Sequence, residues 1–202
     1  MIEGDLVTEV HQTFSEWATH VIRLYKGKPY VEVEWTAGPV PIDTPWLPPV
    51  AFEGHGAHKQ PLPNLWGKEV IVKYASGLES GGKWTTDSNG KEMVPRARDA
   101  RGPTYPHPYK ISEPVAGNYY PVNALQALDD GTHELAVLTD VTQGGASIQD
   151  GALEFMVHRR VQDDDSRGVQ EPLNETMCGC NDIGADPGKM GAHGREGDGG
   201  CE

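Results

Sequence analysis

The feature that most constrains this chain is the alternation of apolar and polar side chains in several short runs. Val31, Val33 and Trp35 alternate with Glu32, Glu34 and Thr36, which is the period expected of a half-buried strand. The same period recurs over 135–140 and 153–158, and residues 70–74 are β-branched and aromatic. Turn signals separate these runs: Ser88-Asn89-Gly90, Asp129-Asp130-Gly131, Gln143-Gly144-Gly145 and Asp150-Gly151. This pattern predicts an all-β fold, an antiparallel β-sandwich.

One segment of the chain is ambiguous. Val10, Phe14, Trp17, Val21 and Leu24 lie at helical spacing. The same stretch, from Val7 to Tyr25, also fits two strands of a hairpin that turns near Glu16-Trp17. Periodicity alone leaves both structures open, and the β-rich context favours the strands.

Composition changes along the chain and predicts its organisation. Residues 1–36 and 67–173 are patterned, whereas residues 37–66 contain seven prolines. Proline cannot donate to a strand ladder, so we expect a Pro-rich insertion or loop at 43–65. The last stretch, 174–202, has many glycines and few large apolar side chains, which favours a disordered tail. We therefore expect one sandwich domain over 1–173, incomplete and interrupted by the insertion, followed by the tail.

The charge of the chain excludes some partners. A formal net charge of -13 argues against nucleic acid, because a phosphate backbone needs a basic surface. It argues equally against an anionic membrane face, and the sequence has no apolar stretch long enough to span a bilayer. The N-terminus lacks the basic and apolar regions of a signal peptide, so we expect no signal peptide in this chain.

Few residue groups suggest chemistry by themselves. His55 and His58 lie in the Pro-rich stretch with no third ligand nearby, and the run 163–165 of three aspartates neighbours arginines. Cys178 and Cys180 make at most half of a zinc site, and with Cys201 they are an odd number. We expect solvated loops and an unstructured tail at these places, with no metal bound by the chain. Asn174-Glu175-Thr176 fits an N-glycosylation sequon, which matters only in the secretory pathway.

Two adjacent tyrosines, Tyr119 and Tyr120, are more unusual. In a strand their side chains point to opposite faces, so one of them must find solvent, a sugar ring or another domain. Satisfaction of both hydroxyl groups inside a sandwich remains the alternative.

Many blocks of the sequence occur together, in this order, in one known family. They are Glu9-Val10-His11-Gln12, Phe14-Ser15-Glu16-Trp17, residues 21–27 and 31–36, Gly67-Lys68-Glu69-Val70, residues 86–90 and 113–123, Val137-Leu138-Thr139-Asp140, residues 143–147, Met156-Val157-His158-Arg159-Arg160 and residues 164–169. With these blocks, which cover about 6–36 and 67–173, the chain resembles the C-terminal β-sandwich region of glycoside hydrolase family 38 α-mannosidases, of the lysosomal acid type.

The resemblance implies a supersandwich-like domain of a retaining exo-α-mannosidase that removes terminal mannose from N-linked oligosaccharides, in a lysosome or vacuole. The family's aspartate nucleophile and its zinc ligands belong to an N-terminal catalytic domain that this chain lacks, so no catalytic residue and no metal ligand carries over. The sandwich packs on that domain and lends a loop to the rim of the active site. The matching loop here is 164–168, with Arg167 and Gly168 as the residues expected to bind the carbohydrate. A local ion pair between Arg167 and the preceding aspartates is the alternative.

The sequence departs from the family in the insertion at 43–65 and after Met177, where further sandwich strands would follow. Two alternatives to an enzyme fragment therefore stay open. The chain is either a stand-alone carbohydrate-binding sandwich or a truncated gene product without a function.

The predicted organisation leads to a proteolysis pattern. Limited digestion of the chain should cut first within 43–65 and 174–202, because a folded sandwich protects its strands from proteases. Mass spectrometry of the early fragments measures this. Early cleavage between Ala116 and Val157 would contradict the predicted domain.

Overall fold

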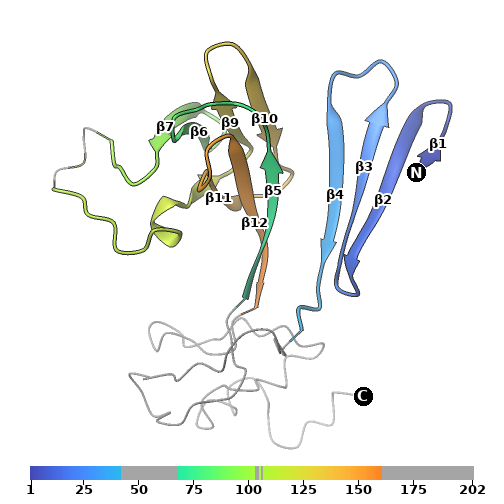
Figure 1. Ribbon diagram of the computed structural model, residues 1–202, viewed down its shortest axis with the longest axis horizontal. Coiled ribbons are helices and arrows are strands. Elements are labelled where there is room, and N and C mark those ends of the chain that lie inside the picture. The colour runs from blue at the N-terminus through green and yellow to red at the C-terminus, as the bar shows by residue number, and fades with distance from the viewer. Residues whose placement is uncertain (42–67, 103–104, 106, 161–202) are drawn as a thin grey trace, which may run out of the picture. The chain divides into compact units, whose positions relative to one another are not determined.

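The computed structural model of the chain describes residues 1–41, 68–102, 105 and 107–160. These residues form three four-stranded antiparallel sheets and one short 3₁₀ helix, so the all-β prediction is confirmed (Figure 1). The chain divides into two compact units, Met1–Glu69 with His158–Glu202 and Val70–Val157. The predicted insertion at 43–65 and the predicted tail at 174–202 lie outside the described residues, and the single domain over 1–173 stays a prediction.

The first unit contains a sheet in which the strands follow one another in chain order. It is made of β1 (Ile2–Glu3), β2 (Val7–Ser15), β3 (Ala18–Tyr25) and β4 (Val31–Ala37). The ambiguous stretch from Val7 to Tyr25 is therefore the hairpin of β2 and β3, which turns at Glu16-Trp17 and pairs Ser15 with Ala18. The helical spacing of its apolar residues was misleading, because these residues lie on both faces of the hairpin, as Val21 and Leu24 of β3 do, and a β-bulge lies between Thr13 and Ser15.

The two faces of this sheet differ in chemistry. Val10, Ile22 and Val33 are direct cross-strand neighbours on one face. Glu9, Arg23 and Glu32 are neighbours on the other face. No side chain of these four strands is fully buried.

The sandwich lies in the second unit, apart from the first residues of β5 and the last of β12. One sheet has the order β10-β9-β6-β7 and the other the order β5-β12-β11-β8. The strands of the first are β6 (Lys83–Ser88), β7 (Glu92–Ala97), β9 (Leu125–Asp129) and β10 (Glu134–Leu138). Those of the second are β5 (Lys68–Ala75), β8 (Tyr120–Val122), β11 (Gln143–Ala146) and β12 (Ala152–Arg160), and the 3₁₀ helix η1 (Ala116–Asn118) precedes β8.

A single apolar cluster fills the space between these two sheets. Trp84 and Leu128 come from one sheet, whereas Val122, Leu153 and Phe155 come from the other, and each is at most 3% exposed. Burial of one such side chain stabilises a fold by roughly 1.5–3 kcal/mol. The alternations read in the sequence at 135–140 and 153–158 place Leu135, Val137 and Val157 against this cluster.

The turns agree with the sequence at three places and differ at one. Asn89 and Gly90 have φ values of 52° and 67°, the left-handed conformation that the β6–β7 hairpin turn requires. Gly131 and Gly151 also have positive φ in predicted turns. The fourth prediction, a turn at Gln143-Gly144-Gly145, was wrong, because these residues form strand β11.

Position 145 of strand β11 is occupied by a glycine, because the core leaves no room for a side chain there. A Cβ atom at this position would lie 2.6 Å from Cγ2 of Val122 and would collide with the carboxamide of Gln126. Gln126 is fully buried, and its Nε2 donates to the carbonyl of Ala146 at 2.9 Å, which joins β9 of one sheet to β11 of the other. The two sheets are thus in close contact at a glycine.

This close approach leads to a matched pair of variants. Gly145→Ala should lower the free energy of unfolding by about 1–3 kcal/mol, since an added methyl group overpacks the core. Gly144→Ala should have a small effect, because its Cβ would meet Tyr119 at an ordinary contact of 3.4 Å. Denaturant unfolding of both variants measures the difference. An equal loss of unfolding free energy in Gly145→Ala and Gly144→Ala would contradict the described packing.

Candidate functional site

The residues that the sequence singled out for sugar binding are not in the described part of the chain. Arg167 and Gly168 lie outside it, as do His55, His58 and the aspartates at 163–165. The sequon at Asn174 and the cysteines of the tail also lie outside it. The role of Arg167 and Gly168 therefore stays a prediction.

The two adjacent tyrosines are described, and each has a hydroxyl partner. Tyr119 donates its hydroxyl to Oε1 of Glu154 at 2.7 Å. Tyr120 accepts a hydrogen bond of 2.6 Å from Nη1 of Arg101, and its ring lies 5.9 Å from that of Trp84 in an edge contact. Local satisfaction of the two hydroxyl groups, which the sequence left as an alternative, is what the structure contains.

Two arginines surround the ring of Tyr120. The guanidinium carbon of Arg96 lies 4.1 Å from the ring centroid and that of Arg101 lies 5.3 Å from it. Arg101 is also 4.0 Å from the ring centroid of Tyr109. Cation–π contacts of this kind contribute roughly 0.5–2 kcal/mol each. No sequence pattern marked this cluster, because an arginine that packs on a distant aromatic ring has no distinctive spacing in the chain.

A cavity of about 670 Å³ adjoins the cluster within the second unit. Arg96, Arg101, Trp84 and Tyr120 are among its lining residues, with Ala100 and Gly102. The strand register places the other lining residues on the opposite face of the β10-β9-β6-β7 sheet: Lys83, Thr85, Met93, Pro95, Ala97, Leu125, Ala127, Asp129 and Glu134. This size is within the range of small-molecule sites in proteins.

Asp87 organises the backbone beside the cavity. It is 4% exposed, and its Oδ1 accepts hydrogen bonds of 2.8–3.0 Å from the backbone N–H groups of Asn123, Ala124 and Leu125. Its Oδ2 accepts from Gly90 at 2.7 Å. Burial alone would raise the pKa of this carboxyl, but the backbone donors outweigh it and lower the pKa to about 2. The carboxylate therefore fixes the β6–β7 turn to the connection between β8 and β9.

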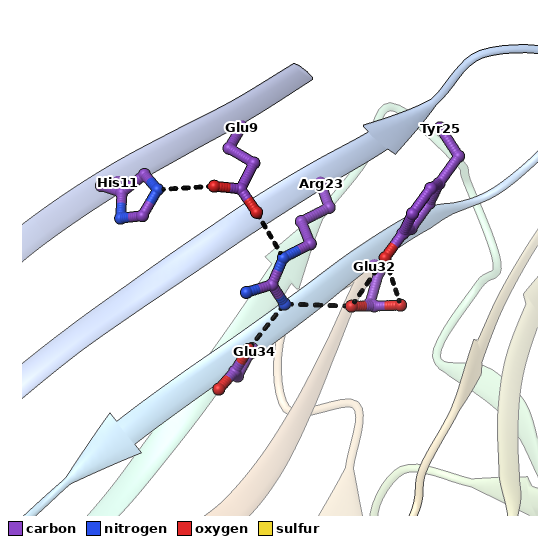
Figure 2. Close-up of polar contacts among 6 residues, drawn as sticks. All are labelled: Glu9, His11, Arg23, Tyr25, Glu32 and Glu34. Atoms are coloured by element: carbon purple, nitrogen blue, oxygen red, sulfur yellow. Dashed lines mark hydrogen bonds and ion pairs between the residues drawn. The ribbon is translucent and has the colours of Figure 1, made fainter. Parts of the chain in front are cut away.

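The polar face of the first sheet carries a network around Arg23 (Figure 2). The guanidinium binds Glu9 at 2.7 Å, Glu32 at 3.0 Å and Glu34 at 2.6 Å, and His11 contacts the other oxygen of Glu9 at 2.9 Å. The hydrogen bond from Arg23 is the main reason that the pKa of Glu9 is lowered. One cation thus holds together three carboxylates from β2 and β4, next to its own strand β3.

The described residues contain neither a metal-binding cluster nor a membrane-spanning helix. They contain no group of three histidine, cysteine, aspartate or glutamate side chains that would hold a metal ion. Within the same part of the chain, no helix is long and apolar enough to cross a membrane.

Comparison with known proteins gives one consistent family. Residues 1–167 match the family described as glycosyl hydrolases family 38 C-terminal domain. The lysosomal alpha-mannosidase of Homo sapiens is 46% identical over 180 residues, which are 89% of this chain and 16% of that protein. The lysosomal alpha-mannosidase of Mus musculus is 47% identical over 89% of this chain and 15% of its own length. The alpha-mannosidase of Canavalia ensiformis is 43% identical over 87% of this chain and 16% of its own length. The chain therefore spans about 15–16% of the length of these relatives.

The Asp87 anchor leads to a prediction about stability. Asp87→Ala should lower the free energy of unfolding at pH 7 by about 1–3 kcal/mol, because buried N–H donors lose their acceptor. The pKa of Asp87 is lower in the folded chain than the ordinary 3.8, so its stabilisation is complete above pH 3.8. It is lost as the pH falls from 3.8 towards 2, and the difference between wild type and variant should narrow over that range.

Asp130→Ala is the matched control for this experiment. Asp130 also accepts two backbone N–H bonds, from Thr132 and His133, but it is exposed. Asp130→Ala should lower the free energy of unfolding at pH 7, measured with urea, by less than Asp87→Ala does. A control that is as damaging as Asp87→Ala would show that burial of the acceptor does not matter.

The Arg23 network leads to a prediction about salt. Arg23→Met keeps the apolar stem but leaves three carboxylates facing one another, so the melting temperature should fall. The loss should shrink as salt is added, because ions screen the repulsion between exposed charges. Lys26→Met, which removes an exposed cation outside the network, is the control. Equal melting temperatures of the two variants at low salt would contradict a central role for Arg23.

Proposed function

The chain belongs to the glycosyl hydrolase family 38 C-terminal domain family, and from this membership we propose that it is one part of a retaining exo-α-mannosidase. The whole enzyme hydrolyses terminal α-mannose of N-linked oligosaccharides in a lysosome or vacuole. The observation that carries this proposal is the 46% identity to a lysosomal alpha-mannosidase over 89% of the chain. The matched stretch runs through both compact units.

The part played by this chain is structural support of the catalytic machinery. Retaining hydrolysis needs two carboxyl groups roughly 5–5.5 Å apart on either side of the scissile bond. The family's nucleophile and general acid belong to a catalytic domain outside this chain, and the sandwich packs on that domain. Arg167, with Gly168, contributes a loop to the rim of the active site, where the guanidinium donates hydrogen bonds to sugar hydroxyl groups.

Zinc belongs to the catalytic domain in this proposal. The described residues do not fit the metal, because they bring no three metal-ligating side chains together. No step of the reaction is therefore assigned to zinc on this chain.

A stand-alone carbohydrate-binding sandwich has less support. Such modules stack sugar rings on exposed aromatic faces. Arg96 and Arg101 lie against the ring of Tyr120, and Trp84, at 3% exposed, belongs to the core. Phe14, Tyr30 and Tyr105 are exposed, but the rings of Phe14 and Tyr30 have edge or tilted contacts with His20 and Tyr25, and that of Tyr105 with His107 and Tyr109. Binding of methyl α-mannoside by the isolated chain, measured by calorimetry, would revive this alternative.

The proposed function is tested by replacement within a whole enzyme. The matched segment of the lysosomal alpha-mannosidase of Homo sapiens is replaced by residues 1–167 of this chain. We expect the chimera to hydrolyse an aryl α-mannoside at acidic pH, whereas the isolated chain should show no turnover with or without added zinc. Turnover by the isolated chain, or a folded chimera without any activity, would contradict the proposal.

The rim loop has its own variant in the same chimera, extended to residue 173. Arg167→Ala should lower kcat/KM by about 10-fold or more, since a charge-assisted hydrogen bond is worth about 1.5–3 kcal/mol. The control is Arg159→Ala, because Arg159 forms an exposed ion pair of 3.5 Å with Glu69. An Arg167 variant with the activity of the Arg159 variant would exclude the rim role.

A further inference from the structure

The turn between β6 and β7 contains the groups needed for a spontaneous modification of the chain. Asn89 is followed by Gly90, and none of the other five asparagines of the sequence precedes a glycine. Both turn residues are exposed to solvent. The backbone nitrogen that follows an asparagine attacks its side chain most readily when it belongs to a glycine, because no Cβ atom obstructs closure of the five-membered ring. Asn89-Gly90 is therefore the position of the sequence best suited to deamidation.

The reaction needs no partner other than water. The nitrogen of Gly90 gives up its proton to solvent and bonds to Cγ of Asn89. The bond from Cγ to Nδ2 then breaks, and the leaving group takes up a proton and departs as ammonia. Water opens the cyclic imide at one of its two carbonyl carbons. The products are an aspartate at position 89 or an isoaspartate, in which the backbone continues through the side chain. The nitrogen of Gly90 is thus the nucleophile, and it has to lose its proton first.

In the folded chain this N–H group is occupied by a buried carboxylate. Gly90 donates it to Oδ2 of Asp87 at 2.7 Å, the shortest of the four backbone bonds to that side chain. Asp87 is 4% exposed. Burial would raise its pKa, but the backbone donors lower the pKa to about 2, so the acceptor is ionised at neutral pH. A deprotonated nitrogen beside an ionised carboxylate is disfavoured, because two like charges repel strongly where little water screens them. The bond therefore opposes the first step of the reaction.

The remaining bonds of the turn hold the backbone of Asn89 in place. Its own N–H donates to Oδ1 of Asn123 at 3.1 Å, and the N–H of Lys91 donates to the carbonyl of Ser88 at 3.0 Å. Asn89 itself is in the left-handed conformation, with a φ of 52°. In that conformation the Cβ atom of a residue points away from the nitrogen that follows it. Ring closure therefore requires a backbone rotation at Asn89 that the turn resists.

We propose that Asn89 is the site at which this chain deamidates, and that the carboxylate of Asp87 protects it in the folded chain by holding the N–H of Gly90. Each opening of the β6–β7 turn releases the nucleophile. The product no longer fits the closed turn, because an aspartate at position 89 adds a negative charge near Asp87 and an isoaspartate lengthens the backbone by one atom. The proposal is independent of the mannosidase assignment, because its residues all lie in the β6–β7 hairpin.

The test follows deamidation of the full chain by mass spectrometry at slightly alkaline pH, with fragmentation to distinguish aspartate from isoaspartate at position 89. The folded wild-type chain should react at Asn89 at least about 10-fold more slowly than the chain unfolded in guanidinium chloride. Asp87→Ala should raise the rate of the folded chain by at least about 10-fold, as loss of a hydrogen bond to a charged acceptor predicts. Asn89→Gln should abolish the change at this position, because the longer side chain would have to close a six-membered ring.

Gly145→Ala is the matched control for Asp87→Ala. Both variants are expected to lower the free energy of unfolding by a similar amount, but Gly145→Ala keeps the bond between Asp87 and Gly90. Its rate of deamidation at Asn89 should stay close to that of the wild type. Equal rates in the two variants would show that global unfolding controls the reaction, and would overturn the proposed protection by Asp87.

A measurement on the wild-type chain decides the question if Asp87→Ala does not fold. Hydrogen exchange of the Gly90 amide should be slow, although the residue is exposed, because Asp87 holds its proton. Exchange of this amide at the rate of an unfolded chain would contradict the protection. Faster deamidation at another asparagine of the folded chain, or equal rates at Asn89 in the folded and unfolded chains, would also overturn the proposal.

Discussion

The described sandwich depends on the burial of five large apolar side chains between two facing sheets. Trp84, Val122, Leu128, Leu153 and Phe155 are withdrawn from water almost completely. No comparable set exists in β1–β4, where every side chain keeps some exposure. Apolar burial is the dominant favourable term in folding. The core of the second unit therefore contributes more to the free energy of folding than strands β1–β4 do.

Polar side chains then fix how the two sheets meet. Gln126 crosses the core to the carbonyl of Ala146, and the missing side chain of Gly145 makes room for it. Asp87 ties the β6–β7 turn to residues 123–125 at the edge of the same core. A buried polar group is costly unless it is hydrogen-bonded, so these contacts specify one arrangement of the sheets. In this arrangement Arg96 of one sheet lies against the ring of Tyr120 of the other.

Much of the fold followed from short-range patterns, and the site did not. Alternation located β4, β10 and β12, and Asn89-Gly90 marked a hairpin, since each depends only on neighbours in the chain. Gln143-Gly144-Gly145 misled because its glycines respond to Gln126 and Val122, which are distant in sequence. Arg96 and Arg101 were missed for the same reason: their significance arises from Tyr120, which β8 brings beside them. Arg167 and Gly168, which only the family resemblance pointed to, stay predictions.

Hydrogen exchange tests the central claim, that the core between the two sheets of residues 70–157 organises the described chain. The most protected backbone amides measure where the structure is hardest to open. The slowest exchange is predicted in β6, β9, β11 and β12, with the N–H groups of Ala124 and Leu125 protected by Asp87. Faster exchange is predicted throughout β2, β3 and β4. Slower exchange in β2–β4 than in β6, β9 and β12 would contradict the account.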